Sequence, residues 1–193
     1  MRRLEVRGAT REDVPLVLDL IRELAEYEKL SHEVVATEGS LLEWLFGDRP
    51  VAEVLVAEYG GEAAGFALFF HNFSTFLGKP GIYLEDLYVR PHFRRSGIGK
   101  SMLAHLARLA RERGCGRLEW SVLDWNEPSI RFYESLGAVA MDDWTVHRMT
   151  GEALEKLADV EGPLTAAVEE APQVGASRGK PLPDPVSRSG VNS

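Results

Sequence analysis

The chain has 193 residues, 45% of them hydrophobic and 27% charged, with a formal net charge of -8 at pH 7. These values are typical of one water-soluble globular domain, and the acidic excess argues against nucleic acid as a partner, because nucleic-acid binding depends on Lys and Arg. No apolar stretch is long enough for a membrane span or a signal peptide, so we expect a cytoplasmic protein with no membrane partner. The single cysteine, Cys115, excludes an internal disulfide, and we expect no bound metal.

The first half of the sequence predicts strands and helices in alternation. In chain order we expect a short strand at 3–9, a helix capped by Thr10, a shorter helix opened by Thr37, a hairpin of strands at 51–59 and 62–70, and a loop at 71–81. The first helix is indicated by apolar residues at helical spacing from Leu16 to Leu24, with Asp13 three positions after Thr10. Two central glycines between runs of alternating pattern indicate the hairpin.

The second half continues this alternation. In chain order we expect a strand at 82–89, a helix from Ile98 to Gly114, a strand at 116–125, a helix at 127–137, a strand at 138–149 and a helix at 151–158. Strands that alternate with helices, with one hairpin among them, predict a mixed α/β sheet with helices on both faces. Residues 160–193 contain five of the ten prolines and no aromatic residue, so we expect a folded domain at 1–159 and a disordered tail at 160–193.

The segment RRSGIGKS, residues 94–101, combines basic residues and glycines just before a helical pattern. It fails the Walker A pattern, because Arg94 stands where glycine is needed, and it fails the dinucleotide fingerprint, because Met102 stands at the third glycine position. What remains is Arg94-x-x-Gly97-x-Gly99, a geometry that aims backbone N–H groups and the positive end of a helix at one point. It predicts a site for an anion of pyrophosphate size. The alternative is a basic surface turn.

Arg94-x-x-Gly97-x-Gly99 after IYLEDLYV, with NEPSIRFYESLGA further along the chain, resembles the acetyl-CoA-binding core of the Gcn5-related N-acetyltransferases, the GNAT superfamily. Three strings are similar to the diamine (spermidine/spermine) acetyltransferases, closest to the branch that acetylates thialysine: ELAEYEKL at 23–30, YLEDLYV at 83–89 and VLDWNEPSIRFYESLGA at 122–138. The resemblance covers about residues 4–158. It implies a mixed, mostly antiparallel central sheet of about six to seven strands with helices on both faces, acetyl-CoA as the acetyl donor, and a homodimer.

The resemblance also implies which residues bind acetyl-CoA. The pantetheine arm is expected to pair along the strand that ends at Val89, the pyrophosphate to lie on the loop, and the start of the helix at 127–137 to line the far side. The expected residues are Leu87, Tyr88, Val89, Arg94, Arg95, Ser96, Gly97, Ile98, Gly99, Lys100, Asn126, Glu127, Pro128 and Ser129. For Lys100, an ordinary exposed helix lysine is the alternative.

Acetylation of an amine needs a proton acceptor, because an amine of lysine type has a pKa of about 10.4 and is protonated at pH 7. The resemblance implies Glu85 as a general base acting through a bound water. The alternatives for Glu85 are a solvated strand residue or a partner of Arg90, and the adjacent Asp86 could take either part. The leaving thiolate needs an acid, for which the resemblance implies Tyr133; core packing is the alternative there. A backbone N–H at 87–89 is expected to stabilise charge on the carbonyl oxygen.

The acceptor is harder to predict. Acidic residues dominate between Glu12 and Glu38, which suits a polycation, although a solvated helix face explains most of them equally well. The acceptor contacts that the resemblance implies are Tyr27, Glu28, Glu85, Glu119, Trp120 and Ser121, with Asp142 or Asp143 as a further candidate. We expect acetyl transfer to a small cationic amine, such as a polyamine, thialysine or a related diamine. The alternatives are a protein or amino-acid N-acetyltransferase and a non-catalytic acyl-CoA-binding sensor.

Overall fold

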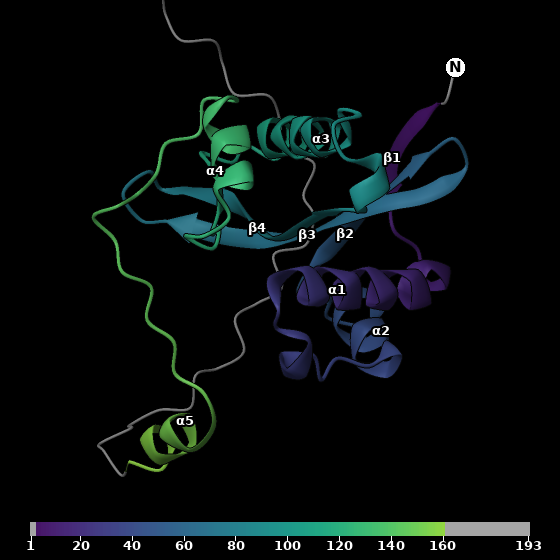
Figure 1. Cartoon of the computed structure of the whole chain (residues 1–193). Coiled ribbons are helices and arrows are strands. Elements are labelled where there is room, and N and C mark those ends of the chain that lie inside the picture. Colours follow the sequence, from purple (N-terminus) through teal and green to yellow (C-terminus); the bar gives the residue numbers. More distant parts are fainter. Residues whose placement is uncertain (1–2, 161–193) are drawn as a thin grey trace, which may run out of the picture. The chain divides into compact units, whose positions relative to one another are not determined.

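A computed structural model describes residues 3–160 and divides the chain into two compact units, Met1–Val139 and Ala140–Ser193. The first unit holds one β-sheet and four α-helices among its described residues (Figure 1). Its elements are β1 (Leu4–Gly8), α1 (Val14–Glu28), α2 (Glu38–Phe46), β2 (Glu53–Tyr59), β3 (Glu62–Ser74), β4 (Lys79–Val89), α3 (Ile98–Glu112), β5 (Leu118–Trp120) and α4 (Glu127–Glu134). Three short 3-10 turns accompany them, at Arg11–Asp13, Ser31–Glu33 and Pro91–Phe93.

The strands lie in the order β1-β2-β3-β4-β5. Neighbours are antiparallel except β4 and β5, which run parallel. α1 and α2 cover one face of the sheet, and α3 and α4 lie on the other (Figure 1). The expected mixed, mostly antiparallel sheet with helices on both faces is therefore confirmed, but the described residues form five strands, fewer than we expected.

The sheet is buried on both faces, so its central strands are apolar at successive positions. In β2, Leu55 belongs to the cluster that packs under α3, whereas Val56 belongs to the cluster that packs under α1 and α2. Successive side chains of a strand point to opposite faces. Val17 of α1 and Met102 of α3, neither of them exposed to solvent, complete the two clusters.

An ion-pair network holds the start of α1. The backbone N–H of Thr10 donates to Asp13 Oδ2 at 2.7 Å, as the capping pattern predicts. The guanidinium of Arg7 in β1 donates to both oxygens of Asp13, at 2.7 and 2.9 Å, and to Glu58 of β2 at 2.8 Å. These hydrogen bonds from Arg7 hold the pKa of Asp13 well below its usual range. The helix is thereby fixed to the edge of the sheet.

The loop expected at 71–81 is wrong, because β3 continues to Ser74 and β4 begins at Lys79. The polar residues that suggested a loop have partners in β5 and in the turn between β3 and β4. Asn72 donates to Glu119 at 2.8 Å, and the Ser74 hydroxyl accepts the Leu77 N–H at 3.2 Å inside the turn. Because these hydrogen bonds replace those that the side chains would make with water, β3 can continue through the polar residues up to Ser74.

Two further strands differ from expectation. The strand expected at 116–125 is limited to Leu118–Trp120. The strand expected at 138–149 is wrong, since these residues have no regular structure, and from Val139 onward all are exposed. Trp144, for example, is 70% exposed. An apolar pattern forms a strand only where a neighbouring strand supplies hydrogen bonds.

The described part of the second unit, residues 140–160, contains α5 (Gly151–Ala158). Its side chains are exposed throughout. Apart from Val160, the tail expected at 160–193 lies outside the described residues. Among residues 3–160, no helix is both long and apolar enough to cross a membrane.

Candidate active site

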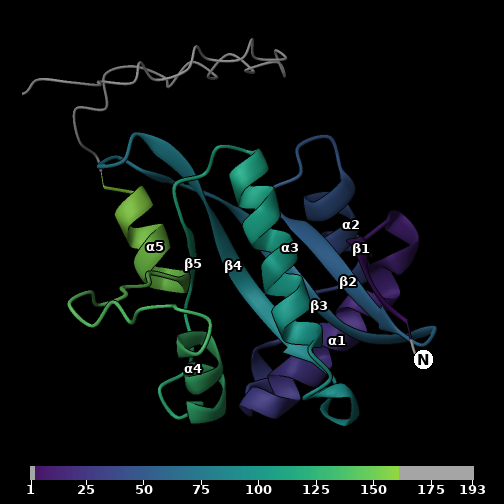
Figure 2. The same ribbon diagram turned by 90° about the horizontal axis from the view of Figure 1, so that it is seen from above.

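The sheet opens between β4 and β5. The two strands pair only from Ile82↔Leu118 to Leu84↔Trp120, while β4 runs on to Val89. Among the described residues no strand lies beside the last five residues of β4 on that side. The backbone at 87–89 therefore has no strand partner on that side, as the expected pairing with a pantetheine arm requires. In Figure 2, α3 lies over the sheet. α4 lies near the N-terminal end of α3, on the side of β4 where β5 runs.

A β-bulge interrupts β4 just before this edge. The neighbouring β3 residues Leu68 and Phe69 pair with Asp86 and Leu84 of β4. Glu85, which lies between these two, therefore has no residue opposite it in β3. Leu84 and Leu87 both pack in the cluster under α3. In a regular strand, residues three apart point to opposite faces, but Leu84 and Leu87 share the face under α3. The bulge explains this, because it places the two residues between them, Glu85 and Asp86, together on the face that α1 covers.

Electrostatic interactions connect three carboxylates and a phenol near the bulge. Burial, followed by the charges of Glu85 and Glu28, raises the pKa of Asp86 to about 7. Burial also raises the pKa of Glu28, at the end of α1. Burial and then the charge of Glu28 raise the pKa of Tyr133 to about 12. Glu28 thus lies within electrostatic reach of both Asp86 and Tyr133, and residues from α1, β4 and α4 share one site.

Tyr133 is held by aromatic packing. Its ring centre lies 4.9 Å from that of Trp120 and 5.3 Å from that of Phe132, both at tilted angles. It packs on the cluster under α3, so the core-packing interpretation is correct as far as its ring is concerned. At neutral pH its hydroxyl is protonated and available as a donor. An acid role for this hydroxyl and packing for its ring are therefore compatible.

The loop before α3 has the geometry of an anion site. Gly97 caps the helix with φ 81°, in the left-handed region that favours glycine. The first backbone hydrogen bond of the helix runs from the Ser101 N–H to the Gly97 carbonyl at 3.0 Å. The N–H groups of Ile98, Gly99 and Lys100 therefore have no partner within the helix. The first helical turn contains no acidic residue that would oppose an anion.

The Arg94 side chain, at the start of the loop, is held by contacts with Tyr27 and Val89. Its guanidinium carbon lies 4.4 Å from the centre of the Tyr27 ring, and its Nε donates to the Val89 carbonyl at 3.0 Å. The Tyr27 hydroxyl in turn donates to Oδ1 of the buried Asn126 at 3.3 Å. We call these three side chains, Arg94, Tyr27 and Asn126, the clamp. It connects the loop, the end of α1 and the start of α4.

Other expected site residues already have partners. The Glu119 carboxylate accepts from Asn72 and forms an ion pair with Arg117 at 2.7 Å. Ser121 shares a hydrogen bond of 2.8 Å with the Tyr83 hydroxyl. Glu127 pairs with Arg131 on the surface of α4. Arg90, which was an alternative partner for Glu85, instead binds Glu23 at 2.7 Å.

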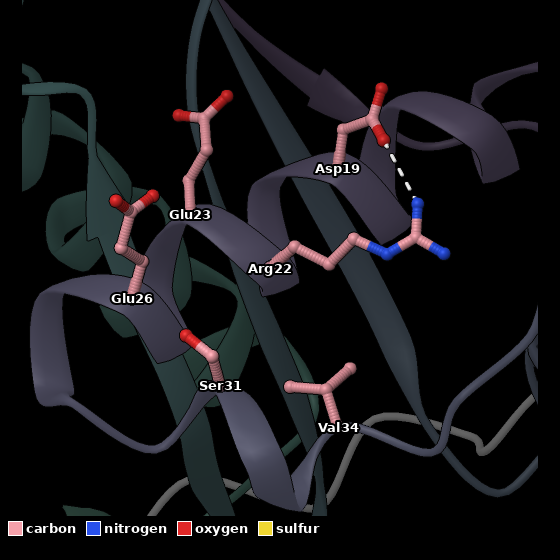
Figure 3. Close-up of a pocket in the computed structure, with 6 residues that line it drawn as sticks. All are labelled: Asp19, Arg22, Glu23, Glu26, Ser31 and Val34. Carbon is pink, nitrogen blue, oxygen red and sulfur yellow. Dashed lines mark hydrogen bonds and ion pairs between the residues drawn. The ribbon is translucent and has the colours of Figure 1, made fainter.

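A shallow hollow of about 540 Å³ lies on α1 and the 3-10 turn that follows it. Figure 3 shows the residues that line it: Asp19, Arg22, Glu23, Glu26, Ser31 and Val34. Asp19 pairs with Arg22 at 3.4 Å, and Glu23 pairs with Arg90, so much of this acidic surface is neutralised. The hollow does not include the bulge or the loop. Within residues 3–160 there is no group of three or more His, Cys, Asp and Glu that could hold a metal ion.

Sequence reasoning missed the clamp and weighed Asp86 only as an alternative to Glu85. No sequence signal predicts the contact of Arg94 with Tyr27, which are far apart in the chain. The bulge, in contrast, has a weak signal in YLEDLYV, where two apolar residues that share a face are separated by two carboxylates. Asp142 and Asp143 are exposed residues of the second unit.

Comparison with known proteins shows the family of this chain. The profile of the acetyltransferase (GNAT) family matches residues 17–138. A thialysine N-epsilon-acetyltransferase from Bos taurus is 40% identical over 164 residues, which cover 79% of this chain and 96% of the relative. An L-ornithine N5-acetyltransferase from Arabidopsis thaliana is 34% identical, covering 79% of this chain and 86% of the relative.

Among solved structures, an integron cassette protein from the mobile metagenome of V. cholerae matches with a TM-score of 0.69 at 26% identity, covering 81% of this chain and 98% of that one. An aminoglycoside acetyltransferase from an uncultured soil sample matches with a TM-score of 0.64 at 21% identity, covering 77% and 95%, a likeness of fold alone. The chain belongs to the acetyltransferase (GNAT) family. It is an N-acetyltransferase, and its expected likeness to the thialysine-acetylating branch is confirmed.

Proposed function

We propose that this enzyme transfers an acetyl group from acetyl-CoA directly to the primary amine of a small cationic molecule: a polyamine, thialysine or a related diamine. The observation that carries the proposal is the arrangement at one end of β4 of an unpaired strand edge, a loop that begins α3 with N–H groups lacking helical partners, and three carboxylates. The edge and the loop suit a donor with an amide-containing arm and a pyrophosphate. The carboxylates suit a cation, and the relatives named above act on thialysine and ornithine.

The chain's residues fit acetyl-CoA as the donor substrate. Backbone groups of 87–89 would pair with the pantetheine arm, and the free N–H groups at the start of α3 would bind the pyrophosphate together with Arg95 and Lys100. Residues 126–129 would line the far side. Arg94 would act by holding the loop in place, because its guanidinium already contacts Tyr27. The bound donor supplies a thioester carbonyl that an amine can attack.

The catalytic groups would be a carboxylate of the bulge and Tyr133. The carboxylate takes a proton from the ammonium form of the acceptor. Glu85 is the expected residue for this role, and Asp86 is the alternative. Tyr133, whose phenol is protonated at neutral pH, donates to the leaving sulfur. A backbone N–H at 87–89 meets charge on the carbonyl oxygen. Glu28 and Glu85 attract the cation, with Tyr27 beside them and Glu119, Trp120 and Ser121 further along the acceptor site.

Turnover with a panel of amines tests this function. The chain is incubated with acetyl-CoA and, separately, with spermidine, thialysine, ornithine and lysine, and thiol release is followed. We expect turnover with at least one of the amines. Tyr133→Phe should lower kcat by about 100-fold, because the proton donor is lost, with the affinity for CoA nearly unchanged. Tyr59→Phe is the matched control and should keep kcat.

A non-catalytic acyl-CoA sensor and a protein N-acetyltransferase are the alternatives. Absence of turnover with every amine, while calorimetry shows CoA binding, would favour the sensor. The half-buried Asp86 and Tyr133 argue against it, because a sensor has no need of paired acid and base groups. A homodimer and a cytoplasmic location, both expected from the sequence, belong to this proposal as well.

A further inference from the structure

A group of polar side chains lies on the sheet face opposite α3, next to the bulge of β4. In β5, Leu118 and Trp120 pack in the cluster under α3, so Glu119 between them points to the other face. Glu85 of the bulge is turned to that same face. Glu119 lies beside Tyr83 of β4, which precedes Glu85 by two residues. The polar group therefore continues the surface on which the acceptor amine is proposed to lie.

The Glu119 carboxylate is already neutralised. Its Oε2 forms an ion pair with the Arg117 Nε at 2.7 Å, and Asn72 Nδ2 donates to the same oxygen at 2.8 Å. The side chains of Arg117 and Glu119 are 35% and 36% exposed, so a small molecule can reach both. A second ammonium group of a polyamine would meet the guanidinium here as well as the carboxylate. Glu119 is therefore a weak site for such a group.

The Arg117 guanidinium has uncommitted donors. Its Nε contacts Glu119 without an aligned hydrogen bond, and its two terminal nitrogens bond no other described residue. The side chain passes over Gly81 of β4, where a Cβ would come within 3.0 Å of the Arg117 Cγ. Since it runs from Gly81 toward Glu119, it extends along the sheet in the direction of the bulge. A fork of N–H donors is thus available on the acceptor surface.

We propose that Arg117 binds the carboxylate of a diamino-acid acceptor whose distal amine lies at the bulge; this rests on the proposed function. The Arg117 carbonyl accepts the Ile82 N–H at 3.1 Å, and Glu85 follows Ile82 by three residues, roughly 10 Å along the strand. The side chains of Arg117 and Glu85, with an extended acceptor between them, bridge this separation. Guanidinium and carboxylate match as a bidentate pair.

The charges of the pair select for an amino acid. An α-amino-acid end carries one carboxylate and one ammonium group, which are the opposites of the Arg117 and Glu119 charges. Both hydrogen bonds and ion pairs of Glu119 use Oε2, so Oε1 is left for the α-ammonium group. A polyamine has no carboxylate to offer the guanidinium. We therefore expect thialysine and ornithine to be better acceptors than spermidine.

The test compares acceptors that differ only by the carboxyl group: ornithine with putrescine, and thialysine with bis(aminoethyl) sulfide. With saturating acetyl-CoA, kcat/KM is measured for wild type, Arg117→Gln and Arg117→Lys. Arg113→Gln is the matched control, because it breaks an ion pair of similar exposure, with Glu53, away from the site. For the wild type we expect the amino acid of each pair to be preferred by about tenfold or more.

Arg117→Gln should lower kcat/KM for the two amino acids by about 10- to 100-fold, mainly through KM, because charge-assisted hydrogen bonds to the carboxylate are lost. For the two amines without a carboxyl group it should raise kcat/KM by about threefold, since the unpaired Glu119 then attracts the second ammonium group. Arg117→Lys keeps the charge without the fork and should fall between the two. Arg113→Gln should behave as the wild type does.

An equal loss for both members of each pair would show a structural defect and overturn the role of Arg117. If Arg117→Gln does not fold, Arg117→Lys decides in the same way: an equal loss, or no loss, for the two members of a pair overturns it. A wild type that prefers the amines without a carboxyl group also overturns it, while the proposed function stands. If the wild type acetylates none of the four acceptors or spermidine, the proposed function itself fails, and the role of Arg117 with it.

Discussion

At the scale of single residues, the burial of Asp86 makes the stability of the protein depend on pH. Burial of a carboxylate beside Glu85 and Glu28 disfavours its charged form, so its pKa is about 7 in the folded protein, against about 3.9 in an unfolded chain. Between these values the folded state binds more protons than the unfolded state. The contribution of Asp86 to the free energy of unfolding is therefore retained below about pH 4 and lost as the pH rises to about 7.

Asp86→Asn should consequently stabilise the protein at pH 8. We expect the free energy of unfolding to increase by about 2 kcal/mol at pH 8, with little change near pH 4, because the neutral amide removes the cost of a buried charge. Urea unfolding at the two pH values measures this. An equal effect at both values would show that Asp86 is not the titrating group.

At the scale of elements, the clamp joins three parts of the site. Arg94 belongs to the loop, Tyr27 to α1 and Asn126 to the start of α4, and each contacts the next. A donor bound at the loop, as proposed, would therefore be linked to the end of α1, which carries Glu28, a proposed contact of the acceptor. The guanidinium is needed for this because it can lie flat on a ring while its Nε bonds a carbonyl.

Arg94→Lys should weaken CoA binding while the charge at the loop is kept. We expect the dissociation constant to rise about threefold to tenfold, as for the loss of a cation–π contact, with the same salt dependence as the wild type. Calorimetry at two salt concentrations measures both quantities, and Arg95→Gln serves as the comparison that removes a charge. An unchanged dissociation constant of Arg94→Lys would contradict the clamp, because a residue that acts on phosphate only through its charge can be replaced by lysine.

The order of elements up to α4 could be predicted because periodicity and glycine positions are local properties of the sequence. The loop at 94–101 could be predicted for the same reason. The bulge at Glu85 could not, because it depends on the register between β3 and β4. The extension of β3 through Asn72 could not, because its partner Glu119 is distant in sequence. The strand expected at 138–149 failed because an apolar pattern does not specify a neighbour.

At the scale of the whole molecule, family membership fixes amine acetylation but not the acceptor. One scaffold serves many acceptors, because function depends on the site and not on the fold. The relatives named for thialysine and for ornithine show this, since this chain covers most of both. The net charge of -8 adds a general attraction for cations over neutral or acidic molecules.

A single competition experiment tests the central claim most directly. The full chain is incubated with acetyl-CoA and an equimolar mixture of thialysine, ornithine, spermidine and a lysine-containing peptide, and mass spectrometry identifies the acetylated products. We predict that one or more of the three small amines gains an acetyl group on a primary amine, with one free thiol formed per acetyl group, while the peptide stays unmodified. Acetylation of the peptide alone, or thiol release without any acetylated amine, would contradict the proposal.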